Sequence, residues 1–88
     1  MVGLEELSSL TLCNNKLSEV LLVQLPKLTD LDLSNNQLWD SSALHLYTLT
    51  QLKDLRLNGN HFKHIDVDSL TELKQLYVNG NKLTSLCL

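Results

Sequence analysis

One pattern of eleven residues recurs along this chain at nearly constant intervals. The stretch LTDLDLSNNQL (28–38) places leucine at its first, fourth, sixth and eleventh positions and asparagine at its ninth. Three more copies follow the same pattern, with Phe62 and Val78 as the only replacements of a patterned leucine: LSSLTLCNNKL (7–17), LKDLRLNGNHF (52–62) and LKQLYVNGNKL (73–83). The copies begin 21, 24 and 21 residues apart. The pattern therefore predicts a tandem array of one structural unit.

The pattern LxxLxLxxNxL resembles the signature of the leucine-rich repeat family from Leu7 to Leu86. The resemblance implies an α/β solenoid with a parallel concave sheet of short strands and irregular or short helical convex segments. We expect a single domain, residues 1–88, with repeats at about 7–27, 28–51, 52–72 and 73–88. The 21-residue repeats resemble the short intracellular type and the 24-residue repeat resembles the typical class, so the subfamily is open.

Leucine content explains how so short a chain can enclose a core. There are 24 leucines among 88 residues, and stacked repeats would merge them into one interior. The net charge is -3, from seven Lys and Arg against ten Asp and Glu spread along the chain. This distribution offers no basic patch for nucleic acid. The acidic start and the lack of a long apolar run also predict no secretion signal and no membrane partner.

Two cysteines bear on the compartment. Cys13 and Cys87 fall in the first and last repeats, and three strand spacings of about 4.8 Å would hold them roughly 14 Å apart, beyond the ~7 Å Cα limit for a disulfide. We expect free thiols. Extracellular members of the family usually carry cysteine-rich caps, which are missing here, and the sequence has no Asn-x-Ser/Thr acceptor. Both absences favour a cytoplasmic location.

The fourth and sixth positions of each copy predict a short strand whose leucines point inward, at residues 9–12, 30–33, 54–57 and 75–78. Behind these strands we expect apolar side chains to fill the core: Val20, Val23 and Leu25 in the first repeat, and Ile65 and Leu70 in the third. SLTE (69–72) resembles a capping box, but the next strand is too close for more than a turn.

The spacer of the second repeat is the longest, with room for a helical turn or two. Asp40 or Ser41 is placed to cap it, and Leu44, Leu46 and Leu49 offer an inward stripe. Because Leu44 and Leu46 are two residues apart, they do not fit one face of a regular helix, and we expect an irregular or short helical segment.

The ninth-position asparagines are expected to be structural: Asn15, Asn36, Asn60 and Asn81. A carboxamide carries both donors and an acceptor, so one such residue per repeat can bridge neighbouring turns that would otherwise hold unpaired backbone groups. The residues before them are of types that tolerate tight turns: Asn14, Asn35, Gly59 and Gly80.

Two groups of polar residues invite a chemical interpretation. His61, His64, Asp66 and Asp68 could suggest zinc or manganese, but their spacing fits no zinc signature and we expect them in solvent. Carboxylates on the open strand face, beside Lys53 and Arg56, could be read as catalytic. A solvated cross-strand pair of Asp32 with Arg56 is simpler. No nucleophile or cofactor motif accompanies them, so we expect no metal, no cofactor and no enzymatic activity.

The open strand face is the predicted binding surface, because the fifth positions should form a row along its middle. The candidate partner-binding residues are Thr11, Asp30, Asp32, Lys53, Asp54, Arg56, Gln75 and Tyr77, together with Trp39. Arg56 and Tyr77 are the best hot-spot candidates, since arginine and aromatic side chains carry much of the energy of interfaces. A merely solvated face is the alternative for each residue. Trp39 either covers the edge of the core or marks a second contact surface.

The resemblance implies a protein-binding scaffold that presents its concave sheet to another protein. The alternative is a self-assembling unit, or a fragment or engineered truncation of a longer array, because no polar cap follows Leu83, Leu86 and Leu88. We expect that flank to meet either a second copy or the rest of a longer array.

Overall fold

Short strands and two short helices make up the regular structure of the chain. The computed structural model describes residues 5–87, with only the backbone of Cys87. The elements are β1 (Ser9–Thr11), β2 (Asp30–Asp32), the 3-10 helices η1 (Ser41–Leu44) and η2 (Leu46–Thr48), β3 (Asp54–Arg56), β4 (His64–Asp66), β5 (Gln75–Tyr77) and β6 (Ser85–Cys87).

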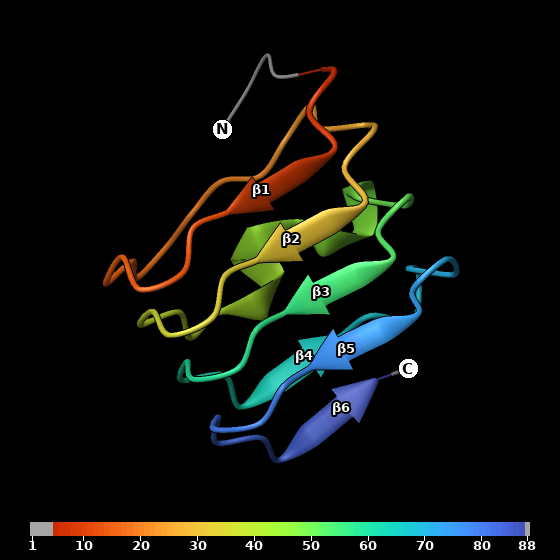
Figure 1. Ribbon diagram of the computed structural model, residues 1–88. Helices are drawn as coiled ribbons and strands as arrows, with labels where there is room; N and C mark the ends of the chain where they lie inside the picture. Colours follow the sequence, from red (N-terminus) through yellow and green to blue (C-terminus); the bar gives the residue numbers. More distant parts are fainter. Residues whose placement is uncertain (1–4, 88) are drawn as a thin grey trace.

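Four of these strands form a parallel sheet in the order β1-β2-β3-β5 (Figure 1). The fourth-position leucines are partners across it: Leu10, Leu31, Leu55 and Leu76. This confirms the predicted parallel sheet. Each strand ends one residue earlier than predicted. The sixth-position amide still bonds to the next strand, as Leu33 N does to Arg56 O at 2.8 Å, but the ladder stops there because the chain then enters the asparagine turn.

The back of the molecule carries the two helices and a second parallel sheet, β4-β6 (Figure 1). This sheet is not predicted by the repeat pattern, from which Ile65 is expected only as a core residue. The starts of repeats three and four are 21 residues apart, and so are their back segments, with His64 opposite Ser85 and Ile65 opposite Leu86. The two back segments therefore lie in register and form a second ladder.

The longer second repeat accommodates its extra residues as the two 3-10 helices. Asp40 caps η1 as predicted, accepting from the amide of Ser42 at 3.0 Å. His45, at φ 53°, breaks the helix between η1 and η2. The break lets both Leu44 and Leu46 turn inward, 1% and 4% exposed. The prediction of a short, irregular helical segment is confirmed.

Residues 69–72 form turns and no helix. Leu70 N bonds to Val67 O at 3.0 Å and Leu73 N to Leu70 O at 3.2 Å, so two consecutive turns carry the chain to β5. Among the described residues, no side-chain hydrogen bond of a capping box forms at Ser69 or Glu72. The predicted turn is confirmed, and the likeness of SLTE to a capping box has no structural counterpart.

The core lies between the four-stranded sheet and the layer of η1, η2 and β4. Its wholly buried members include Leu31, Leu55 and Ile65, the last as predicted. In the first repeat the prediction was partly wrong: Val20 and Val23 are half-buried, and Leu22 takes the fully buried place beside Leu25. The reason is local alternation, since exposed Leu21 stands between half-buried Val20 and buried Leu22.

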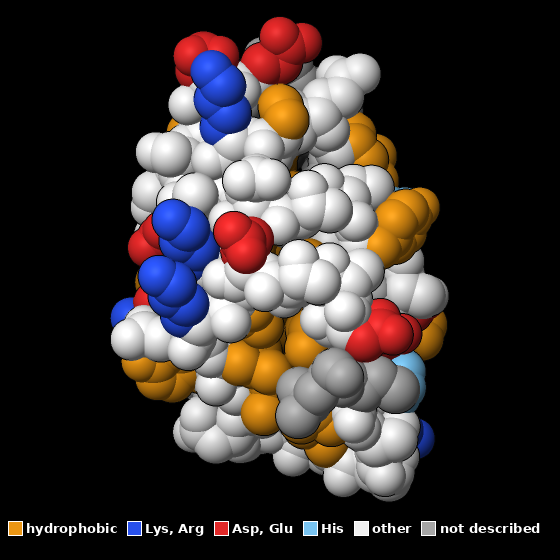
Figure 2. Space-filling model, turned by 90° about the vertical axis from the view of Figure 1, so that its right-hand side faces the viewer, with side chains coloured by type: hydrophobic (Ala, Val, Ile, Leu, Met, Phe, Trp, Pro, Cys, Tyr) orange, Lys and Arg blue, Asp and Glu red, His pale blue; other side chains and the backbone are white. Residues whose placement is uncertain are grey.

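The apolar interior is less well covered in the outer repeats than in the middle. Leu10 in β1 and Leu76 in β5 are half-buried, whereas their partners in β2 and β3 are buried. Leu83 is half-buried, Leu86 is 38% exposed, and Leu88 lies outside the described residues. Figure 2 shows hydrophobic side chains reaching the surface in the half of the molecule that carries β5 and β6.

Candidate functional site

The solvent side of the four-stranded sheet carries two rows of side chains that alternate with the buried leucines. We call this surface the concave face. Its two rows are Ser9, Asp30, Asp54 and Gln75, and Thr11, Asp32, Arg56 and Tyr77. Both are in register across all four strands, which brings eight side chains from distant parts of the sequence onto one surface. A hollow over β1, β2 and β3 lies along these rows.

Arg56 is the best-fixed side chain of the concave face. Its Nε lies 3.2 Å from Asp54 Oδ1, and its guanidinium carbon lies 4.8 Å from the centre of the Tyr77 ring. The hydrogen bond to Asp54, and then the charge of that carboxylate, raise the pKa of Arg56 further above its ordinary value. The side chain remains 46% exposed. A stacked, ion-paired arginine that still reaches solvent is a pre-organised contact.

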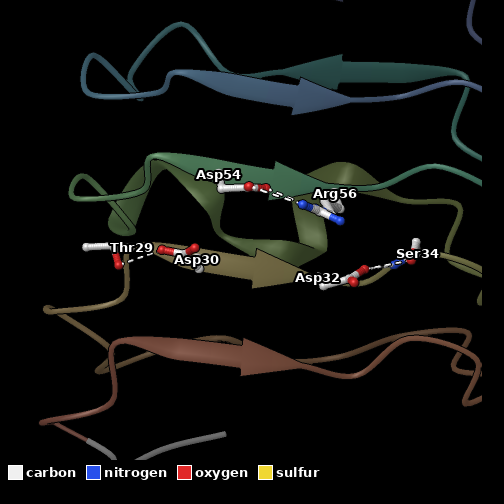
Figure 3. Close-up of polar contacts among 6 residues, drawn as sticks. All are labelled: Thr29, Asp30, Asp32, Ser34, Asp54 and Arg56. Carbon is white, nitrogen blue, oxygen red and sulfur yellow. Dashed lines mark hydrogen bonds and ion pairs between the residues drawn. The ribbon is translucent and has the colours of Figure 1, made fainter.

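The predicted pair of Asp32 with Arg56 is wrong. Their Cα positions are partners, but Arg56 turns along its own strand to Asp54, while Asp32 accepts from the amide and the hydroxyl of Ser34 at 3.0 and 2.6 Å (Figure 3). Asp32 keeps a weaker influence, as a minor electrostatic cause of the raised pKa of Arg56. Ser34, which is 7% exposed, is not among the residues predicted from the repeat pattern. The signal that identifies it is the Asp-x-Ser spacing, which is typical of a local turn.

The remaining acidic residue of the rows, Asp30, is exposed and accepts a 2.8 Å hydrogen bond from the hydroxyl of Thr29 (Figure 3). Lys53 and Lys74 stand directly before β3 and β5, which are neighbours in the sheet. A hydrogen bond from Lys74 N to Lys53 O, at 2.8 Å, joins the two residues. Both lysines are exposed. They form a basic margin next to the rows.

Trp39 does not belong to the concave face. It is 64% exposed and, with Val20 and the buried Leu38 and Leu44, lines a small hollow. Its indole therefore lies at the edge of the core on a separate surface, and a role in partner binding stays a prediction.

The asparagines run along the turn that follows the four-stranded sheet. Asn36 donates from Nδ2 to Leu12 O and Leu33 O, both at 3.0 Å, and its Oδ1 accepts from Leu17 N at 3.0 Å. Asn60 makes the equivalent bonds one repeat on: Nδ2 donates to Leu33 O and Leu57 O, and Oδ1 accepts from Leu38 N. Asn81 repeats the pattern with Leu57 O, Val78 O and Phe62 N. Each of these three carboxamides thus joins two adjacent repeats.

Asn15 differs from the other three. It is exposed, and among residues 5–87 its carboxamide donates only to Cys13 O, two residues away. The residues before the asparagines all take positive φ, between 58° and 72°, as their types predicted: Asn14, Asn35, Gly59 and Gly80.

On the convex side, His64, Asp66 and Asp68 are exposed. Hydrogen bonds from the amide and then the side chain of Asp68 lower the pKa of Asp66, while the side-chain contact with Asp66, and then its charge, raise the pKa of Asp68. His64 Nδ1 contacts the hydroxyl of Ser85. In the part of the chain that the structure describes, no three or more His, Cys, Asp or Glu side chains gather as a metal site.

Cys13 is a free, half-buried thiol next to β1. Cys87 ends β6, which belongs to the other sheet, and its side chain lies outside the described residues. Among residues 5–87, no helix has the length and apolar character that crossing a bilayer requires.

Stacked units with a shared core, each paired to its sequence neighbour, define a solenoid repeat protein. Residues 26–83 match the family described as leucine rich repeat. The chain belongs to the leucine-rich repeat family, as the repeated pattern predicted. Comparison with curated proteins and with solved structures found no match. Leucine-rich repeats are generally protein–protein interaction modules, and such domains are typically not enzymes.

Proposed function

We propose that this chain binds another protein through its concave face. The observation that supports the proposal is the stacking of Arg56 on Tyr77 at 4.8 Å, which joins β3 to the edge strand β5 on a face of otherwise polar side chains. Arginine and tyrosine are enriched among the residues that dominate binding energy. Their mutual contact limits the side-chain freedom that a partner would otherwise have to restrict. Thr11, Asp30, Asp32, Lys53, Asp54 and Gln75 surround this pair and would supply polar contacts.

The test compares partner capture by the wild-type chain with capture by Arg56→Ala and Tyr77→Ala variants. Tyr47→Ala is the matched control, because Tyr47 is 62% exposed on η2, on the opposite side of the molecule. Proteins captured by both wild type and control, but lost from both concave variants, are then purified and their affinities measured. Truncation of a hot spot should weaken binding about thirtyfold. Equal affinity of all four chains would count against the concave face.

The partner affinity of a Trp39→Ala variant, measured in the same series, tests the role of Trp39. If Trp39 marks a second contact surface, its truncation weakens binding of a partner that also depends on Arg56. If Trp39 only covers the edge of the core, the partner affinity stays at the wild-type value.

Self-association is a second candidate function, which the 38% exposure of Leu86 favours. The outer edges of β5 and β6 are unpaired within the described chain, and open strand edges offer backbone donors and acceptors to a second copy. The same flank would equally meet a further repeat of a longer array. Sedimentation of the chain at several concentrations tests for the second copy.

A further inference from the structure

The concave face divides into halves of opposite charge. Over β1 and β2 lie the exposed residues Ser9, Thr11 and Asp30 and the half-buried Asp32. Within the described residues neither carboxylate forms an ion pair; Asp30 accepts from Thr29 and Asp32 from Ser34. This half is therefore acidic, and its carboxylates are held by neutral donors only.

Over β3 and β5 the balance is reversed. Asp54 is neutralised by Arg56, and its side chain is only 18% exposed. Lys53 and Lys74 are exposed and take part in neither ion pair of the described chain. Figure 2 shows Lys and Arg side chains along the margin of this half. Glu72 is exposed in the turn before Leu73 and forms no ion pair within the described residues, so this margin carries two lysines against one carboxylate and keeps a net positive charge.

The charge separation points to an oriented partner. We propose that the concave face binds an extended protein segment whose positive end lies over β1 and β2 and whose negative end lies over β3 and β5. This inference rests on the proposed function and specifies the partner that it would take. Opposite charges facing each other steer association and fix orientation more than they add affinity, and a segment placed the other way round would set like charges together.

The spacing of the strands sets the length of such a segment. Four adjacent strands about 4.8 Å apart span about 14 Å, which an extended chain covers in roughly four to five residues at about 3.3 Å each. Charges at the two ends of a peptide of about six residues therefore reach both halves at once.

The experiment uses the isotope-labelled 88-residue chain and a synthetic peptide with two lysines at one end and two aspartates at the other. A spin label is attached at the lysine end, and amide signals of the chain are followed by NMR. We expect the label to broaden Ser9–Thr11 and Asp30–Asp32 more strongly than Gln75–Tyr77. Peptides of the same length carrying only lysines or only aspartates should bind at least severalfold more weakly.

A charge-reversed variant controls for chance proximity. It combines Asp30→Lys with Lys53→Glu and Lys74→Glu, and leaves the bonded groups of Asp32, Asp54 and Arg56 intact. The broadening should move to Gln75–Tyr77, while the amide spectrum reports whether the variant is folded. If it is not, the single changes Asp30→Asn and Lys74→Gln must each reduce the asymmetry of broadening.

The outcomes separate the two proposals. Equal broadening at both ends of the sheet, or equal binding of the uniformly charged peptides, would overturn the inferred orientation and leave the concave face as a binding surface. Absence of any peptide effect on the concave amides also overturns the inference, whereas the proposed function depends on partner capture by the Arg56 and Tyr77 variants.

Discussion

The side-chain oxygen of Asn36 accepts a hydrogen bond from the backbone amide of Asn15 at 2.9 Å, across the boundary between two repeats. The bond joins the same position of successive units and shows how one residue type holds the array together. No earlier repeat within the described chain donates such a bond to Asn15, and its carboxamide is exposed. The four asparagines are therefore equivalent in sequence and unequal in structure.

Replacing Asn36 or Asn60 with alanine should destabilise the fold by about 1 to 3 kcal/mol each, because buried backbone groups lose their partners. Asn15→Ala is the matched control and should cost less. Urea denaturation of the three variants measures the differences. Equal midpoints for Asn15→Ala and Asn60→Ala would show that the bridging bonds contribute nothing.

Gly59 is required both by its φ of +71° and by space, since a Cβ there would overlap Asn35 Oδ1. Gly59→Ala should lower the free energy of unfolding by about 1 to 3 kcal/mol, because a residue with a side chain is strained at positive φ. In Gly80→Ala the new Cβ would lie 3.3 Å from its nearest atom, Gly59 N, so the loss of stability should be smaller. The overlap is also removable: Asn35→Gly should recover part of the loss in a double variant. No recovery in thermal denaturation would leave backbone strain as the sole cause.

Asp40 gives a pH-dependent contribution to stability. The pKa of Asp40 lies below its ordinary value, chiefly because the Ser42 hydroxyl donates to it at 2.6 Å. A carboxyl with a lowered pKa in the folded state adds stability above its unfolded pKa, and that stability is lost as the pH falls through the folded pKa. Ser42→Ala should raise the pKa of Asp40 towards its ordinary value, measured by NMR titration. Ser41→Ala should leave it unchanged; similar shifts in both variants would contradict the assigned cause.

Arg56→Ala and Tyr77→Ala should hardly change the denaturation midpoint, because these side chains are 46% and 39% exposed. Leu55→Ala, at a wholly buried core position of β3, should lower the free energy of unfolding by about 2 to 5 kcal/mol by leaving a cavity. Chemical denaturation of the three variants makes the comparison. A large loss of stability in Arg56→Ala would mean that the residue is structural, and its use in the capture experiment would have to be abandoned.

Leu86→Lys should reduce self-association if the exposed flank pairs two copies. The expected result is a concentration-dependent increase in sedimentation coefficient for the wild-type chain and a smaller one for the variant. Tyr47→Lys, at a site 62% exposed on the other part of the convex side, is the control. A wild-type chain that stays monomeric at every concentration defeats the pairing idea.

Several features of the fold follow from residues whose neighbours are close in sequence. The leucine spacing predicted the strands and their common register, since a strand of period two buries every other side chain. The asparagines and glycines predicted the turns, because few residue types tolerate positive φ. Asp40 and the uneven spacing of Leu44 and Leu46 predicted a capped and interrupted helical segment. Residues 26–83 belong to the family that these repeats indicated.

The sequence by itself thus determined the repeat, the direction of the strands and the residues that share the concave face. Only the tertiary structure decided which charges on that face meet. Asp32 and Asp54 are both neighbours of Arg56. Arg56 forms its ion pair with Asp54 while its guanidinium lies over the ring of Tyr77, and Asp32 instead accepts a hydrogen bond from Ser34. The pairing of β4 with β6 likewise depends on two back segments lying side by side after stacking. Contacts of this kind arise from three-dimensional neighbours, which a linear pattern does not specify.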